Sequence, residues 1–243
     1  MKIAVISDVH GNIHALKKVL VDINEEMCDQ IISLGDSIAI GPCPKESLDL
    51  MLENNIEMIL GNHEEYYIHG KEHPPAYLSK EEEEHQIWVH RQLGLKYKSI
   101  MGTWNYRIEK EFNGIKVLFA HYGRHEELES FYKFKAPMQK PSIEQLDDTF
   151  KGEQFDLIVY GHEHMNDDSF STATETRYIN PGPLGCNKED YTQYLILEFF
   201  ENGYRVVNRR IVFDKSEVFK TMSEKEMPGR DVIAKFFYNT ILE

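Results

Sequence analysis

The first 62 residues alternate short apolar runs with segments of helical periodicity, which restricts this part of the chain to an α/β fold. Ile3–Ile6, Ile31–Leu34 and Ile56–Leu60 are apolar runs bounded by polar residues, a pattern typical of buried parallel strands. Residues 12–26 carry apolar side chains at helical spacing, and a second helix is expected over about 45–54. The three strands are therefore predicted to share one sheet through right-handed crossovers.

The rest of the chain divides into a helical insertion, a strand-rich part and a helical tail. The insertion covers about 64–103, where Ser79 and Glu82 have the spacing of a capping box and begin a long helix. The following segments predict strands at 104–112, 115–120, 156–160, 177–180, 191–199 and 203–213, with a helix near 142–150. Residues of about 215–243 form the tail. At 243 residues, the chain is expected to be a single domain, 1–243.

Composition excludes several classes of partner. The chain has 41 acidic and 27 basic residues, and a net charge of −14 disfavours binding to nucleic acid or to an anionic membrane surface. No apolar run approaches the ~18 residues of a membrane-spanning helix, and Ile3–Ile6 is too short for the apolar part of a signal peptide. Three cysteines without a C-x-x-C spacing are typical of reduced thiols. We therefore expect a cytoplasmic protein with no nucleic-acid or membrane partner.

Side chains that bind metals or transfer protons follow five apolar runs directly. In open α/β sheets, binding sites form beyond the carboxyl ends of the strands, so side chains at these five ends are expected to converge. Any one of these short motifs is a weak signal, but five in order are hard to explain by folding needs alone. The candidates are Asp8, His10, Asp36, Asn62, His63, Glu64, His121, His162 and His164.

The chemistry of these side chains favours metal ions of a particular kind. Carboxylates, imidazoles and one carboxamide, without cysteine, suit Mn²⁺, Fe or Zn²⁺. The potential ligands exceed the needs of one tetrahedral ion but suit two divalent ions that share a carboxylate. Asp36 stands alone at its strand end and is the simplest bridge. Two such ions would hold the attacking and leaving oxygens of an in-line phosphoryl displacement. Mn²⁺ is our first expectation, with Fe, Ni²⁺ or Zn²⁺ as alternatives.

The order and rough spacing of the motifs resemble a known family. Asp8-x-His10, Gly35-Asp36, Gly61-Asn62-His63-Glu64, His121 and Gly161-His162-x-His164 are similar to the signature of the calcineurin-like metallophosphoesterases. Residues 180–185 also resemble a segment of the small bacterial and archaeal branch of that family. The resemblance implies an α/β (α+β) fold, a four-layer sandwich of two mixed β-sheets flanked by helices.

The resemblance also implies a role for each residue. Asp36 would bridge the two metals, and a hydroxide between them would be the nucleophile. His63 would protonate the leaving oxygen, and Glu64 would orient His63 or tune its pKa. The first metal would be held by Asp8, His10 and His164, and the second by Asn62, His121 and His162.

Two departures from the family pattern bear on the site. The family often has a second acid three residues after the bridging aspartate, but this chain has Ala39, so that support is either missing or supplied elsewhere. Residues 35–41 also lack the arginine of the protein Ser/Thr phosphatases, which disfavours phosphoprotein substrates.

Arg124 lies close in sequence to His121 and, together with Asn62, is a candidate for binding the substrate phosphate. The alternative is a surface ion pair with Glu126 or Glu127.

The resulting hypothesis is a metal-dependent phosphoric ester hydrolase that acts on small phosphate esters, with a small diester as the expected substrate. A phosphomonoesterase, or phosphatase, is one alternative, and a non-catalytic, metal-stabilised interaction scaffold is another. The presence of His63 beside a full ligand set favours the enzyme, because a scaffold does not need a proton donor. A nuclease is disfavoured by the negative charge. The oligomeric state stays open.

Overall fold

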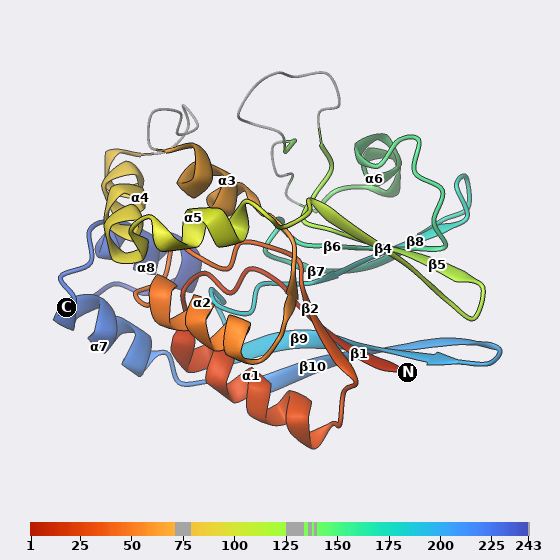
Figure 1. Ribbon diagram of the computed structural model, residues 1–243, viewed down its shortest axis with the longest axis horizontal. Coiled ribbons are helices and arrows are strands. Elements are labelled where there is room, and N and C mark those ends of the chain that lie inside the picture. The colour runs from red at the N-terminus through yellow and green to blue at the C-terminus, as the bar shows by residue number, and fades with distance from the viewer. Residues whose placement is uncertain (71–78, 125–133, 136–137, 139, 243) are drawn as a thin grey trace.

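The computed structural model describes residues 1–70, 79–124, 134, 135, 138 and 140–242, and it contains two mixed five-stranded sheets (Figure 1). The first sheet consists, in order, of β10 (Gly203–Val212), β9 (Tyr191–Phe200), β1 (Lys2–Ile6), β2 (Gln30–Ser33) and β3 (Glu57–Met58). The second consists of β4 (Arg107–Phe112), β5 (Ile115–Ala120), β6 (Leu157–Tyr160), β8 (Thr176–Pro181) and β7 (Asn166–Ser171). β1, β2 and β3 run parallel, as do β5, β6 and β8, while the other pairs are antiparallel.

Alternating side chains of the strands build separate cores and so create the layers. Ile3 and Val5 of β1 face the second sheet, where they share a core with Phe119 of β5. Ala4 and Ile6 point the other way and pack in a core with the helices of the first sheet. These are α1 (Ile13–Glu25), α2 (Pro44–Glu53), α3 (Asn62–His69), α4 (Lys80–Leu93), α5 (Lys96–Met101), α7 (Ser216–Glu224) and α8 (Arg230–Tyr238).

The fourth layer lies on the outer face of the second sheet. Leu118 of β5 and Ile158 of β6 pack there against Leu146 of α6 (Ile143–Thr149), on the side opposite to α1 (Figure 1). The expected four-layer arrangement of two mixed sheets flanked by helices is therefore confirmed. No helix among the described residues is long and apolar enough to cross a membrane.

Two elements differ from the sequence expectation. The helix expected from Ser79 begins there as α4, with the expected capping box, but it is shorter than expected, because Gly94, with φ 62°, ends it and α5 follows as a separate helix. β7 was not expected, because Asn166–Ser171 is a polar segment without apolar alternation, and it forms the edge of its sheet through β8 alone. Residues 71–78 of the expected insertion lie outside the described residues.

The carboxyl ends of strands from both sheets meet at one edge of the molecule. The loop after β1 is hydrogen-bonded to the loop after β2, through Asp8 N–H to the Gly35 carbonyl at 3.1 Å. The loop after β6 joins them, because the backbone N–H of His162 donates to Asp8 Oδ2 at 3.2 Å. Gly161 N–H in turn donates to the carbonyl of His121, the residue that follows β5. The sequence motifs therefore meet across the two sheets.

Candidate metal centre

The first group of side chains comes from the ends of β1 and β6. His10 Nε2 lies 2.9 Å from His164 Nε2, and Asp8 Oδ1 lies 3.4 Å from His164 Nε2 and 3.7 Å from His10 Nε2. Asp8 and His10 are fully buried. Two imidazole nitrogens and one carboxylate oxygen therefore point at a common space.

The second group combines residues that follow β3, β5 and β6. His121 Nε2 is central to it, at 3.0 Å from Asn62 Oδ1 and 3.1 Å from His162 Nδ1. Asp36 Oδ2 lies 3.3 Å from the same nitrogen. The amide oxygen of Asn62 and the carboxylate thus share a space with two imidazoles.

Asp36 stands between the two groups. Potential ligand atoms of Asp36, His121 and His162 lie within 4.8 Å of one another, and so do those of Asp36, His10 and His63. Asp36 Oδ1 accepts the backbone N–H of His63 at 3.0 Å, which leaves Oδ2 to face the histidines. One carboxylate is therefore within reach of both halves of the cluster.

The backbone at this edge is held in a conformation that few side chains adopt. Gly35, with φ 95°, allows two loops to approach closely, since a Cβ there would lie 2.6 Å from the backbone nitrogen of Gly61. Such strain persists only where the surroundings impose it, and it concentrates at functional sites. Five of the seven expected ligands have φ between 47° and 70°, namely Asp8, His10, Asp36, His162 and His164.

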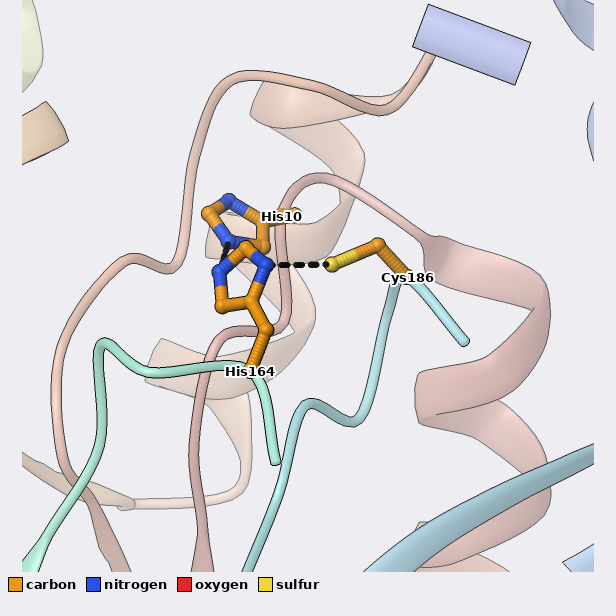
Figure 2. Close-up of side chains that lie close together, drawn as sticks. All are labelled: His10, His164 and Cys186. Carbon is orange, nitrogen blue, oxygen red and sulfur yellow. Dashed lines mark hydrogen bonds between the residues drawn. The ribbon is translucent and has the colours of Figure 1, made fainter. Parts of the chain in front are cut away.

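Contacts behind the cluster orient its imidazoles. His121 Nδ1 lies 2.8 Å from the Leu34 carbonyl, and His10 Nδ1 lies 3.3 Å from the Ile38 carbonyl. His164 Nδ1 instead meets the thiol of Cys186 at 3.5 Å (Figure 2). Partners of this kind fix which nitrogen faces inward, and here they turn the Nε2 atoms of all three rings toward the cluster.

The buried carboxylates and imidazoles of the cluster shift one another's pKa values. Burial alone would raise the pKa of Asp36, but the neighbouring His121 and His63 lower it well below its usual range. Burial would likewise lower the pKa of His121, yet the Asp36 carboxylate raises it to about 9. His10 behaves differently, because burial and the nearby His164 lower its pKa to about 3. Its imidazole is therefore neutral and has a lone pair to offer a metal.

Glu64 is hydrogen-bonded to the backbone of the loop that contains Asp36. Its carboxylate accepts three backbone N–H groups, those of Asp36, Ser37 and Gly61, each at 2.8 Å. Burial, followed by the charge of Asp36, raises the pKa of Glu64 to about 7, although the backbone N–H groups oppose the change. The hydrogen bonds of this carboxylate go to the backbone rather than to the His63 ring.

His63 contacts a residue that the sequence analysis missed. Its Nδ1 lies 2.7 Å from Nε2 of Gln86 on α4, and its Nε2 faces Asp36 Oδ2 at 4.0 Å. Gln86 could have been found as a polar residue on an apolar helix face, because it precedes the buried Val89 and Leu93 by three and seven positions. Cys186 was also missed, although it directly follows the segment 180–185 noted in the sequence.

A cavity of about 360 Å³ lies beside the cluster. It is lined by five of the candidate site residues, namely Asp36, Asn62, His63, His162 and His164. Gln86 and Phe237 line it as well, so that α4 and α8 both contribute to its wall.

Arg124 is placed elsewhere. It lines a different cavity of about 890 Å³, together with residues of β5 and α6. Its guanidinium stacks over the ring of Tyr106, at 3.8 Å from the ring centroid. Glu126 and Glu127, the alternative partners of Arg124, lie outside the described residues.

Comparison with known proteins places this arrangement in a family. The calcineurin-like phosphoesterase superfamily domain matches residues 1–202. An uncharacterised protein of Methanocaldococcus jannaschii is 26% identical over 240 residues, which cover 93% of each chain.

Two solved structures share the fold. A hypothetical protein of Pyrococcus horikoshii has a TM-score of 0.81 at 13% identity, with 99% of both chains covered. A metallophosphoesterase of Sphaerobacter thermophilus has a TM-score of 0.68 at 23% identity, with 94% of this chain and 95% of that one covered. The family match extends over the second sheet and over the first sheet except β10, and it includes every expected metal ligand. The chain belongs to the calcineurin-like phosphoesterase superfamily.

Proposed function

We propose that this protein is a dinuclear metal-dependent phosphodiesterase that hydrolyses a small diester. The family supports phosphoester hydrolysis in general. The dinuclear character is supported by the position of Asp36, whose carboxylate lies within reach of both groups of the cluster. The choice of a diester rests on the residues that line the cavity beside the cluster.

The donor set fits two divalent ions. Asp8 Oδ1 is buried and accepts no hydrogen bond among the described residues, so it lacks the partner that a buried carboxylate oxygen requires. Oxygen and imidazole donors without thiolate suit Mn²⁺, Fe, Ni²⁺ or Zn²⁺. One ion would be held by Asp8, His10 and His164 and the other by Asn62, His121 and His162, with Asp36 shared. Bound there, the ions would supply Lewis-acid stabilisation of the phosphoryl oxygens and a water of lowered pKa.

The residues of the chain contribute orientation and proton transfer. His63 Nε2 faces the cluster beside the cavity, where it is placed to donate a proton to the leaving oxygen. Glu64 holds the loop of Asp36 beside Gly61, the residue that precedes Asn62. Asn62 combines an amide oxygen toward His121 with a position in the cavity wall.

The lining of the cavity favours a diester over a monoester. Among the described residues, no lysine or arginine lines it, and Glu82 and Glu163 add negative charge. A phosphomonoester carries close to two negative charges at neutral pH, whereas a diester carries one. Ile40, Ile233 and Phe237 provide apolar surface for an organic group. This absence of lysine and arginine from the described lining of the cavity is the observation that carries the proposal.

Hydrolysis of two chromogenic esters tests the proposal. The metal-stripped protein is assayed with bis-p-nitrophenyl phosphate and with p-nitrophenyl phosphate, with and without added Mn²⁺. We expect Mn²⁺-dependent release of p-nitrophenol, with a higher kcat/KM for the diester, because the described lining of the cavity offers no lysine or arginine for the second charge of the monoester. A preference for the monoester would assign the protein as a phosphatase. Two bound metals without turnover of either ester would instead support the scaffold alternative.

Cys186 provides a test of the first metal position. The Cys186 thiol contacts Nδ1 of His164, the nitrogen that faces away from the cluster (Figure 2), so its removal frees the ring to rotate. We expect Cys186→Ala to weaken binding of one of two Mn²⁺ ions by about 10- to 100-fold, the usual effect of losing such a partner. Competition with a chelator measures both affinities, and Cys28→Ala is the matched control. Parental affinities in Cys186→Ala would show that the thiol does not support the metal ligand.

A further inference from the structure

We propose that Gln86, on α4, is the positioning residue for the imidazole of His63. This inference rests on the proposed function, in which His63 protonates the leaving oxygen. The amide of Gln86 would hold the ring so that Nε2 faces the cluster and the cavity. It would thereby supply, from a segment remote in sequence, a support that the loop of Asp36 lacks.

The geometry of the two side chains carries the inference. Nε2 of Gln86 donates to Nδ1 of His63 at 2.7 Å, and both side chains are nearly inaccessible to solvent, with 5% and 9% of each residue exposed. A ring that accepts a hydrogen bond at Nδ1 carries its proton on Nε2 when neutral. That nitrogen lies on the side of Asp36, 4.0 Å from Oδ2. The hydrogen bond therefore selects the tautomer that presents an N–H toward the reacting groups.

The other contacts of the His63 ring do not determine which of its nitrogen atoms faces the cluster. His10 and Tyr66 meet the ring edge to face, at centroid distances of 5.3 Å and 5.6 Å, and such contacts do not distinguish the two nitrogens. Ala39 has no polar side chain to offer, and the carboxylate of Glu64 is committed to backbone N–H groups. Gln86 is the hydrogen-bond partner on Nδ1 among the described residues.

The packing of α4 explains why the amide is fixed in place. Ser79 and Glu82 form a capping box that fixes the start of the helix. Val89 and Leu93 lie on the same helix face as Gln86 and are buried in the core that α4 shares with the first sheet. This anchored apolar face holds Gln86 toward the cavity. A side chain on a packed helix is positioned more precisely than one on a loop.

Unlike a carboxylate, the amide of Gln86 has both a hydrogen-bond donor and an acceptor. Its N–H group donates to the neutral ring, and rotation of the amide by half a turn allows Oε1 to accept from the protonated ring. Oε1 of Gln86 is buried and has no hydrogen-bond partner among the described residues, so it is free to take that role. The amide can therefore keep its contact with Nδ1 whichever ring nitrogen carries the proton.

A comparison of leaving groups tests the inference. Gln86→Met removes the hydrogen bond at similar volume. The esters are bis-p-nitrophenyl phosphate and diphenyl phosphate, whose phenol is the poorer leaving group and depends more on protonation. With Mn²⁺ bound, we expect Gln86→Met to lower kcat on diphenyl phosphate by about 10- to 100-fold, the scale of a misplaced catalytic group. The loss on bis-p-nitrophenyl phosphate should be several-fold smaller.

A double variant and a matched control complete the experiment. Added to His63→Ala, Gln86→Met should cause no further loss, because a residue that acts through His63 has nothing left to position. Gln92→Met, the same change at an exposed position of α4, should match the parent protein.

The outcomes separate the two proposals. Equal losses of Gln86→Met on both esters, or a further loss in the His63→Ala background, would overturn the positioning role alone. If the parent protein turns over neither ester with Mn²⁺ bound, the proposed function fails, and this inference fails with it.

Discussion

Replacement of Asp36 by asparagine is expected to lower hydrolysis of bis-p-nitrophenyl phosphate by about 10³-fold or more. Asp36 is the carboxylate within reach of both ligand groups, so its loss removes the link between the two metal positions. Metal ions stabilise the transition state by several kcal/mol, and each 1.36 kcal/mol corresponds to about a factor of ten in rate. Asparagine keeps the size of the side chain but not the charge that draws a cation into the buried cluster. We also expect the number of tightly bound Mn²⁺ ions to fall from two to at most one.

The measurement combines kcat with the metal content of the dialysed protein. Asp168→Asn is the matched control, since Asp168 forms a surface pair with Arg177 on the second sheet, and this variant should retain both ions and the parental rate. Retention of two ions and of parental kcat by Asp36→Asn would show that the carboxylate does not bridge. A circular dichroism spectrum of each variant confirms that the fold is intact.

Replacement of His63 by alanine is expected to lower kcat on diphenyl phosphate by about 10²- to 10⁴-fold, the usual contribution of a general acid. His63 Nε2 faces the cluster and lines the cavity, while its nitrogen atoms are outside the two groups assigned to the metals. The loss on bis-p-nitrophenyl phosphate should be smaller, because p-nitrophenolate leaves without the help of a proton. Binding of Mn²⁺ should be unchanged, in contrast to Asp36→Asn.

The matched control for His63 is His14→Ala, a partly buried histidine of α1 that contacts Thr221. It should retain the parental rate on both esters. If His63→Ala instead loses Mn²⁺, or loses activity equally on both esters, His63 is a metal ligand or a structural residue rather than the acid.

The helices and strands that could be predicted from the sequence are those whose residues show a local pattern of apolar side chains. Ile3–Ile6 is apolar throughout because β1 is covered on both faces, and the sequence therefore predicts the buried parallel strand directly. β7 carries no such pattern, because an edge strand of polar residues is stabilised by its pairing with β8 and not by burial. The break between α4 and α5 depends on the positive φ of Gly94, 62°, and the spacing of apolar residues along a helix does not reveal such a backbone angle.

The same distinction applies to the candidate site. Each expected ligand lies within four residues after a strand, so its place in the chain and the chemistry of its side chain could be predicted together. Arg124 shows the limit of that reasoning, since it lies three residues after His121 but lines another cavity. Nearness in sequence does not determine on which side of a sheet a loop side chain emerges.

The sequence by itself determined the α/β class, the family signature and the set of oxygen and nitrogen donors, because these depend on residues next to each strand. Only the tertiary structure decided which partners surround those donors. Gln86 is 23 residues from His63, and Cys186 is 22 residues from His164. Packing of α4 on the core, and of the loop after β8 beside that after β6, brings each pair into contact. Such contacts depend on the burial of apolar faces elsewhere in the chain, and local sequence does not encode them.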